Sequence, residues 1–157
     1  MDAWCFATDR RSRCYVSPTG ERKWEAVAFS VLIVDDSPAM RKFIRRVLTM
    51  CGLEINECVD AADGQEALDI LRTNWVDIVL TDINMPKMNG EQFVQHMATD
   101  PLLRSIPVLV ISTDQSDARH ERMLGLGAKD YITKPFLPEQ LGDTMSRLLT
   151  GGAYAGN

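Results

Sequence analysis

Short apolar runs recur along this chain, separated by segments in which apolar and polar residues alternate at helical spacing. An apolar run bounded by polar residues is typical of a strand buried on both faces of a parallel sheet. The most distinct run leads from Asp77 to Asp82, and the weakest, about Ile55 to Val59, is interrupted by polar residues. In chain order, the predicted strands are 29–34, 55–59, 77–82, 108–111 and 131–133.

The segments between the strands predict helices. The clearest helix starts at Ser37, which can cap it, has Pro38 in its first turn and ends at Gly52. Its apolar residues follow the i, i+3, i+4, i+7 spacing of one buried face. They are Met40, Phe43, Ile44, Val47 and Leu48. Further helices are predicted after Asp63-Gly64, near Gly90, from about Ser116 to Leu124 and after Pro138.

Strands that alternate with helices favour an α/β domain, a doubly wound parallel sheet with helices on both faces and right-handed crossovers. The chain has 157 residues, enough to bury one sizeable core. The predicted domain spans residues 29–150. Residues 1–28 show no clear periodicity and are predicted to form a poorly ordered N-terminal extension. Residues 151–157 are predicted to be a flexible tail.

Composition narrows the classes of function. The net charge of -5 and the pI near 5.0 argue against binding to nucleic acid. No apolar stretch is long enough to insert in a membrane, and residues 1–10 lack the apolar core of a signal peptide, so we expect a cytoplasmic protein. Four cysteines without a CxxC pair, together with two histidines, argue against a zinc site.

Chemically reactive side chains follow the predicted strands. Asp35 and Asp36 come after the first strand, Asp82 ends the third, Ser112 follows the fourth and Lys134 follows the fifth. We expect these side chains to meet, because open α/β sheets bind ligands at the carboxyl ends of their strands. Three carboxylates would repel one another without a cation, so the cluster predicts bound Mg²⁺. Asp82 is the candidate nucleophile, which would form an aspartyl phosphate.

The order of these motifs resembles a known family. The motifs are Asp35-Asp36, Asp82, Met85-Pro86-Lys87-Met88-Asn89-Gly90, Ser112-Thr113 and Lys134-Pro135-Phe136. Together they resemble the receiver domain of bacterial two-component response regulators, over about residues 29–150. Because the chain stops after the fifth predicted helix, it is most similar to the single-domain, CheY-like members. The resemblance implies a flavodoxin-like (βα)5 fold with strand order 2-1-3-4-5.

The resemblance also implies catalytic and switching roles. Asp82 would be the phosphorylation site, and Lys134 and Ser112 would be catalytic with it. The ammonium of Lys134 would pair with a phosphoryl oxygen, and Ser112 would donate a hydrogen bond to the phosphoryl group. Ser112 and Tyr131 would form the switch. The peptide bond between Lys134 and Pro135 would be cis.

A metal site is implied at the same place. Asp36 and Asp82 would bind Mg²⁺ directly, together with the backbone carbonyl of Asn84. Asp35 would act largely through water.

The implied partners are proteins. A histidine kinase or a histidine phosphotransfer protein would supply the phosphoryl group, and a downstream protein target would read the result. Such a domain catalyses only its own phosphotransfer and autodephosphorylation. The output stays open between chemotaxis through a flagellar motor, another kinase and a further phosphorelay step. The basic face of the first predicted helix is open between a solvated surface and a docking surface.

Three rival functions fit the sequence less well. A haloacid-dehalogenase-type phosphatase would need a second aspartate two residues after Asp82, where this chain has Asn84. A flavodoxin would need a phosphate-binding loop after the first strand, where Asp35 and Asp36 would instead repel phosphate. A degenerate receiver that only binds proteins would lack an acid or the lysine, and none is missing.

Overall fold

The computed structural model describes residues 12–26 and 28–150, and their centre is a five-stranded parallel sheet. Its strands are β3 (Phe29–Val34), β4 (Ile55–Ala61), β5 (Ile78–Thr81), β6 (Val108–Ser112) and β7 (Asp130–Thr133). They lie in the order β4-β3-β5-β6-β7, so the first strand of the domain is flanked by the second and the third. Every neighbouring pair is parallel. The predicted strand order 2-1-3-4-5 is confirmed.

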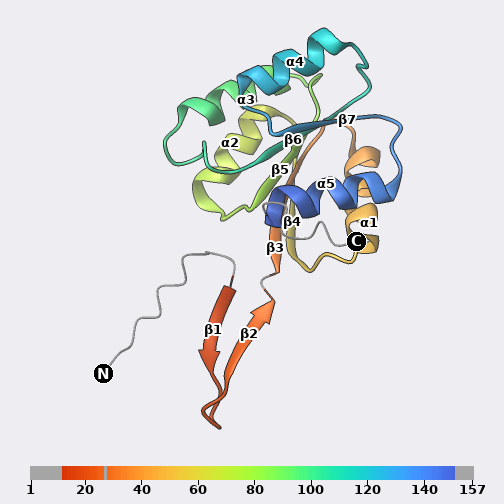
Figure 1. Cartoon of the computed structure of the whole chain (residues 1–157). Helices are drawn as coiled ribbons and strands as arrows, with labels where there is room; N and C mark the ends of the chain where they lie inside the picture. The colour runs from red at the N-terminus through yellow and green to blue at the C-terminus, as the bar shows by residue number, and fades with distance from the viewer. Residues whose placement is uncertain (1–11, 27, 151–157) are drawn as a thin grey trace.

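Helices cover both faces of this sheet (Figure 1). They are α1 (Pro38–Met50), α2 (Gly64–Thr73), α3 (Gly90–Thr99), α4 (Asp117–Leu126) and α5 (Pro138–Thr150). Alternate residues of a strand belong to different cores. In β3, Val31 and Ile33 pack in the cluster that contains the buried residues of α1 and α5, whereas Leu32 and Val34 pack in the cluster of α2, α3 and α4. The doubly wound architecture therefore follows from strands that are apolar on both faces.

Side-chain caps start the helices where the sequence places them. Ser37 accepts the N–H of Met40 at 3.3 Å, and Asp63 accepts the N–H of Glu66 at 2.9 Å. Asn89 forms a capping box with Gln92 at the start of α3. These caps satisfy N–H groups that have no partner within the helix.

One prediction about α1 was wrong. Phe43 was expected on the buried face, but 44% of its surface is exposed. Its ring instead contacts the ring of Phe136 after β7, with centroids 5.7 Å apart.

Residues 12–26 form an antiparallel hairpin that the sequence did not predict. Its strands are β1 (Ser12–Val16) and β2 (Arg22–Ala26), and a turn joins them in which the hydroxyl of Ser17 accepts the N–H of Glu21 at 3.2 Å. The hairpin is a sheet of its own and extends beyond the end of the central sheet where β3 begins (Figure 1). Residues 1–11 and the predicted tail, 151–157, lie outside the described residues.

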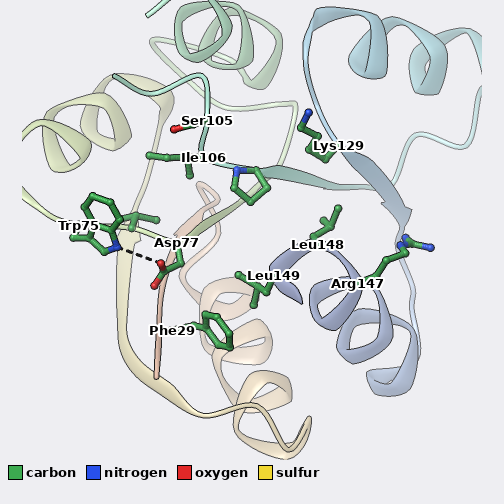
Figure 2. A pocket seen from close by; sticks show the side chains of 11 residues that line it. Phe29, Trp75, Asp77, Ser105, Ile106, Lys129, Arg147, Leu148 and Leu149 are labelled. Atoms are coloured by element: carbon green, nitrogen blue, oxygen red, sulfur yellow. Dashed lines mark hydrogen bonds between the residues drawn. The ribbon is translucent and has the colours of Figure 1, made fainter. Parts of the chain in front are cut away.

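A cavity of about 630 Å³ lies at the amino-terminal ends of the strands, opposite to the predicted site. Its lining includes Phe29 at the start of β3, Trp75 and Asp77 before β5, and Leu149 near the end of α5 (Figure 2). Asp77 accepts hydrogen bonds from the backbone of Ser30 and from the Trp75 indole, at 2.8 and 3.2 Å. The carboxylate of Asp77 is therefore already hydrogen-bonded within the protein.

None of the helices among the described residues is long and apolar enough to cross a membrane.

Deleting residues 1–28 should leave the domain folded. β3 already has β4 and β5 as neighbours, so the hairpin adds no strand to the central sheet. An isolated two-stranded hairpin is also marginally stable by itself. We expect a change in the free energy of unfolding of within about 0.5 kcal/mol, measured by urea denaturation of both chains.

Limited proteolysis gives an independent check on the same segment. Early cuts after Arg13 or Lys23, which leave a stable fragment beginning near Glu25, are expected. Resistance at those bonds, or a large loss of stability on deletion, would mean that the segment belongs to the folded domain.

Candidate functional site

The carboxyl ends of four neighbouring strands bring the predicted site residues to one edge of the sheet. Asp35 and Asp36 follow β3, Asp82 follows β5, Ser112 ends β6 and Lys134 follows β7. Because the strands are parallel and paired in register, these residues lie at the same edge of the sheet although they are far apart in the sequence.

Three carboxylates form the centre of this site. One oxygen from each of Asp35, Asp36 and Asp82 can be chosen so that all lie within 4.8 Å of one another. Asp35 is buried at 2% exposure, Asp82 is half-buried and Asp36 is exposed. Hard carboxylate oxygens at an open position are the donors that Mg²⁺ prefers. The chemistry of the donor set therefore fits the predicted metal.

Lys134 supplies the positive charge of the site. Its Nζ lies 3.1 Å from Asp35 Oδ2 and 3.1 Å from Asp82 Oδ2. Burial alone would lower the pKa of Lys134, but the charges and hydrogen bonds of Asp82 and Asp35 outweigh burial and raise this pKa above its ordinary value. The lysine is therefore an ammonium at neutral pH. The predicted cis peptide bond between Lys134 and Pro135 is confirmed.

A close backbone contact places Asp82. The N–H of Ile83 donates to Asp82 Oδ1 at 2.6 Å, which orients the carboxylate. The N–H of Gly90 donates to the carbonyl of Ile83 at 2.7 Å, which folds the loop 84–89 back onto the end of β5. A Cβ at position 90 would lie 2.2 Å from the backbone oxygen of Asp82. Only glycine allows this approach.

Asp35 is held from α1. Its Oδ1 accepts a hydrogen bond from the N–H of Ser37 at 2.9 Å. Its backbone carbonyl accepts a hydrogen bond from Nη1 of Arg41 at 2.5 Å. Arg41 and Arg45 both pair with Asp60 on β4, at 3.6 and 2.6 Å. Arg41 was part of the basic face that the sequence left open between solvent and docking. Only 17% of this side chain is exposed, and it supports the acidic site.

Ser112 and Tyr131 meet at the backbone of Asp114. The hydroxyl oxygen of Ser112, which is fully buried, accepts the N–H of Asp114 at 3.2 Å. The hydroxyl of Tyr131 donates to the carbonyl of Asp114 at 2.7 Å. Tyr131 is 8% exposed and stacks on His120 of α4, with ring centroids 5.0 Å apart. Burial is the main cause that raises the pKa of Tyr131, so the phenol stays protonated as a donor.

Sequence reasoning missed several residues that support this site. Arg41 and Asp114 act through their contacts with Asp35, Ser112 and Tyr131, and no motif marks them. Asn84 lies in the exposed loop after β5, and its role as a metal ligand stays a prediction.

The fold and the site together define a phosphoacceptor domain of the two-component type, and comparison with known proteins shows the family. Residues 31–146 match the response regulator receiver domain. The chain therefore belongs to the response regulator receiver domain family, and its function is two-component phosphoacceptor signalling.

Relatives of known name cover most of the chain. It is 34% identical over 127 residues to a chemotaxis protein CheY homologue of Campylobacter jejuni, which is 80% of this chain and 96% of that protein. It is 35% identical over 120 residues to chemotaxis protein CheY1 of Helicobacter pylori, covering 76% of this chain and 95% of that one. Its structure is similar to chemotaxis response regulator CheY4 of Vibrio cholerae, with a TM-score of 0.70, 34% identity and coverage of 78% and 99%.

Replacing Gly90 by alanine should damage the site and the fold together. The added methyl group would collide with the backbone of Asp82 and Ile83, which cannot move away as a flexible side chain could. We expect a loss of at least about 1–3 kcal/mol in the free energy of unfolding, the usual range for overpacking, because the atoms that would have to move are backbone atoms. Denaturant unfolding measures the change.

Gly125→Ala is the matched control, because a Cβ at position 125 of α4 would have no neighbour within 4 Å. Alanine in place of this glycine, in the last turn of α4, should leave the stability unchanged or raise it by up to about 1 kcal/mol. Equal stability of the two variants would contradict the close contact at Gly90.

Proposed function

We propose that Asp82 accepts a phosphoryl group, with Lys134 and Ser112 as its catalytic partners. One observation carries the proposal: the Asp82 carboxylate lies beside a largely buried ammonium and two further carboxylates at the carboxyl edge of a parallel sheet. A carboxylate needs such a setting to attack phosphorus, because the transferring group brings more negative charge into an acidic site.

The transfer takes a phosphoryl group from a phosphohistidine. A carboxylate oxygen of Asp82 attacks phosphorus and forms the new O–P bond. The P–N bond breaks, and the leaving imidazole nitrogen keeps its electron pair. The ammonium of Lys134, already 3.1 Å from Asp82 Oδ2, pairs with an oxygen of the transferred group. The hydroxyl of Ser112, whose oxygen accepts the N–H of Asp114, would donate its proton to another oxygen of the transferred group.

Asp35, Asp36 and Asp82 would hold Mg²⁺, with the backbone carbonyl of Asn84 completing the protein's ligands. When bound, the ion supplies positive charge that offsets the repulsion among the carboxylates and stabilises the transferring phosphoryl group. Water later attacks the phosphorus of the aspartyl phosphate, the O–P bond to Asp82 breaks, and inorganic phosphate leaves while the free carboxylate is restored. The domain thus catalyses its own phosphorylation and dephosphorylation.

The partners follow from this chemistry. A histidine kinase or a histidine phosphotransfer protein supplies the phosphoryl group, and a downstream protein reads the phosphorylated state through surface contacts. Chemotaxis is the output that we propose, supported by the two relatives that are named chemotaxis proteins.

Asp82→Asn should abolish phosphorylation. The amide oxygen of asparagine is neutral and a poor nucleophile, so incubation with acetyl phosphate and Mg²⁺ should add one phosphoryl group to the wild-type chain and none to the variant. Intact-protein mass spectrometry measures the gain. Asp77→Asn is the control, since it removes a carboxylate at the opposite end of the same strand and should gain the group normally. A normal gain by Asp82→Asn would place the acceptor elsewhere.

Asp36→Ala should remove most of the affinity for Mg²⁺ and nearly all phosphorylation. In metal-free buffer the same change should stabilise the chain, because it removes one of three mutually repelling carboxylates. In calorimetry without Mg²⁺, Asp36→Ala should melt at a higher temperature than the wild type. Addition of Mg²⁺ should raise the melting temperature of the variant little further.

Asp69→Ala is the control for the loss of an exposed acid, and it should keep the stabilisation by Mg²⁺ seen in the wild type. If Asp36→Ala is phosphorylated normally in the presence of a chelator, Asp35 and Asp36 form only a turn and not a metal site.

A further inference from the structure

Arg119 is the centre of a charge network between α3 and α4. Its Nη1 pairs with Glu91 Oε1, and its Nε lies 3.3 Å from Asp114 Oδ2. Nε of Arg122 binds the other oxygen of Glu91 at 2.9 Å. The hydrogen bond from Arg122 and the charges of both arginines hold the pKa of Glu91 below its ordinary value. The side chain of Glu91 is 16% exposed, and those of Arg119 and Arg122 are 35% and 58% exposed, so these are partly exposed ion pairs.

The two carboxylates that Arg119 joins belong to different parts of the site. Glu91 directly follows Gly90, which lies against the backbone of Asp82. Asp114 lies two residues after Ser112, and its backbone holds both Ser112 and Tyr131. A single guanidinium therefore links the acceptor loop with the backbone on which the two predicted switch residues meet.

We propose that Arg119, paired with Glu91, is a positioning residue that keeps Asp114 where its backbone orients the Ser112 hydroxyl and holds Tyr131 in its buried position. This proposal rests on the proposed function of Asp82. The forked guanidinium suits the role, because it donates to two carboxylates at fixed angles, which a single ammonium does not do. Arg119 touches no reacting atom, so its effect passes through Asp114.

The network favours one arrangement before any phosphoryl group is present. With the network intact, the carbonyl of Asp114 is placed to accept the Tyr131 hydroxyl, so the inward position of the ring is stabilised. A phosphoryl group that uses Ser112 binds the same arrangement better. Its apparent affinity is then set in part by how much of the protein already has that arrangement.

Beryllofluoride, a phosphoryl mimic, tests this assignment. The ¹⁵N-labelled full chain is titrated with beryllofluoride at saturating Mg²⁺ as wild type, as Arg119→Gln and as Arg122→Gln. Arg119→Gln should raise the apparent Kd about two- to fivefold, the range expected from losing a partly exposed ion pair. It should also shift the amide signals of Asp114 and Tyr131 before beryllofluoride is added. Its affinity for Mg²⁺ alone should be unchanged.

Arg122→Gln is the matched control. It removes an arginine from the same Glu91 carboxylate, but no contact to Asp114 is present for Arg122 among the described residues. It should leave the Kd and both amide signals unchanged. Glu91→Gln should reproduce the effect of Arg119→Gln, which provides a second variant if one of them folds poorly.

Two results would overturn the role of Arg119: an unchanged Kd in Arg119→Gln, or an equal rise in Arg122→Gln, which would indicate a general effect of charge. Failure of the proposed function looks different. The wild-type chain would then show no saturable binding of beryllofluoride, or the Asp82→Asn variant would bind beryllofluoride as tightly as the wild type.

Discussion

One ammonium shared by two carboxylates is the interaction on which the site depends. Lys134 reaches Asp35 and Asp82 at the same distance, 3.1 Å, from the end of β7, which is two positions away from β5 and three from β3 in the sheet. Without that charge, a buried and a half-buried carboxylate would face each other in a poorly solvated crevice, at a large cost in free energy. With it, the cluster still carries an excess of negative charge, which favours a divalent cation and then a transferring phosphoryl group.

The fold supplies the remaining constraints through backbone contacts. Gly90 brings the loop after β5 against Asp82, and Arg41 holds the carbonyl of Asp35 from α1. Asp82 and Asp35 are thus held by different parts of the fold, the loop before α3 and helix α1. The carboxylates therefore keep their spacing when no metal neutralises them. A backbone contact is also used at Asp114. Its N–H donates a hydrogen bond to Ser112, and its carbonyl accepts one from Tyr131.

Much of this could be predicted from the sequence because it depends on periodic patterns and on local chemistry. Apolar runs identified most strands of the central sheet, β4 was the weakest because polar residues interrupt it, and Ser37, Asp63 and Ser116 marked helix starts that the structure confirms. Strand ends carried the acids, the hydroxyl and the lysine, so parallel strands sufficed to predict that they meet. The strand order came from the resemblance to the family, since periodicity does not specify which strands are neighbours.

Other features depended on contacts that no local pattern encodes. Phe43 has helical spacing typical of a core residue, yet it lies at the edge of α1 against Phe136, which the sequence places far away. Arg41 and Arg119 look like ordinary surface residues of two helices, and only the packed structure brings carboxylates to them. The hairpin of residues 12–26 has a mixed composition without clear alternation, so its turn contacts and strand pairing were visible only in three dimensions.

The central claim is that the Asp82 carboxylate, and no other acid of the cluster, becomes the acyl phosphate. Borohydride reduces an acyl phosphate to an alcohol, which marks the modified aspartate permanently as homoserine. Peptide mapping of the chain after phosphorylation with Mg²⁺ and reduction with borohydride should find homoserine at position 82 alone, and at no position when the metal is chelated. Homoserine at position 35 or 36, or labelling that persists without metal, would contradict the account.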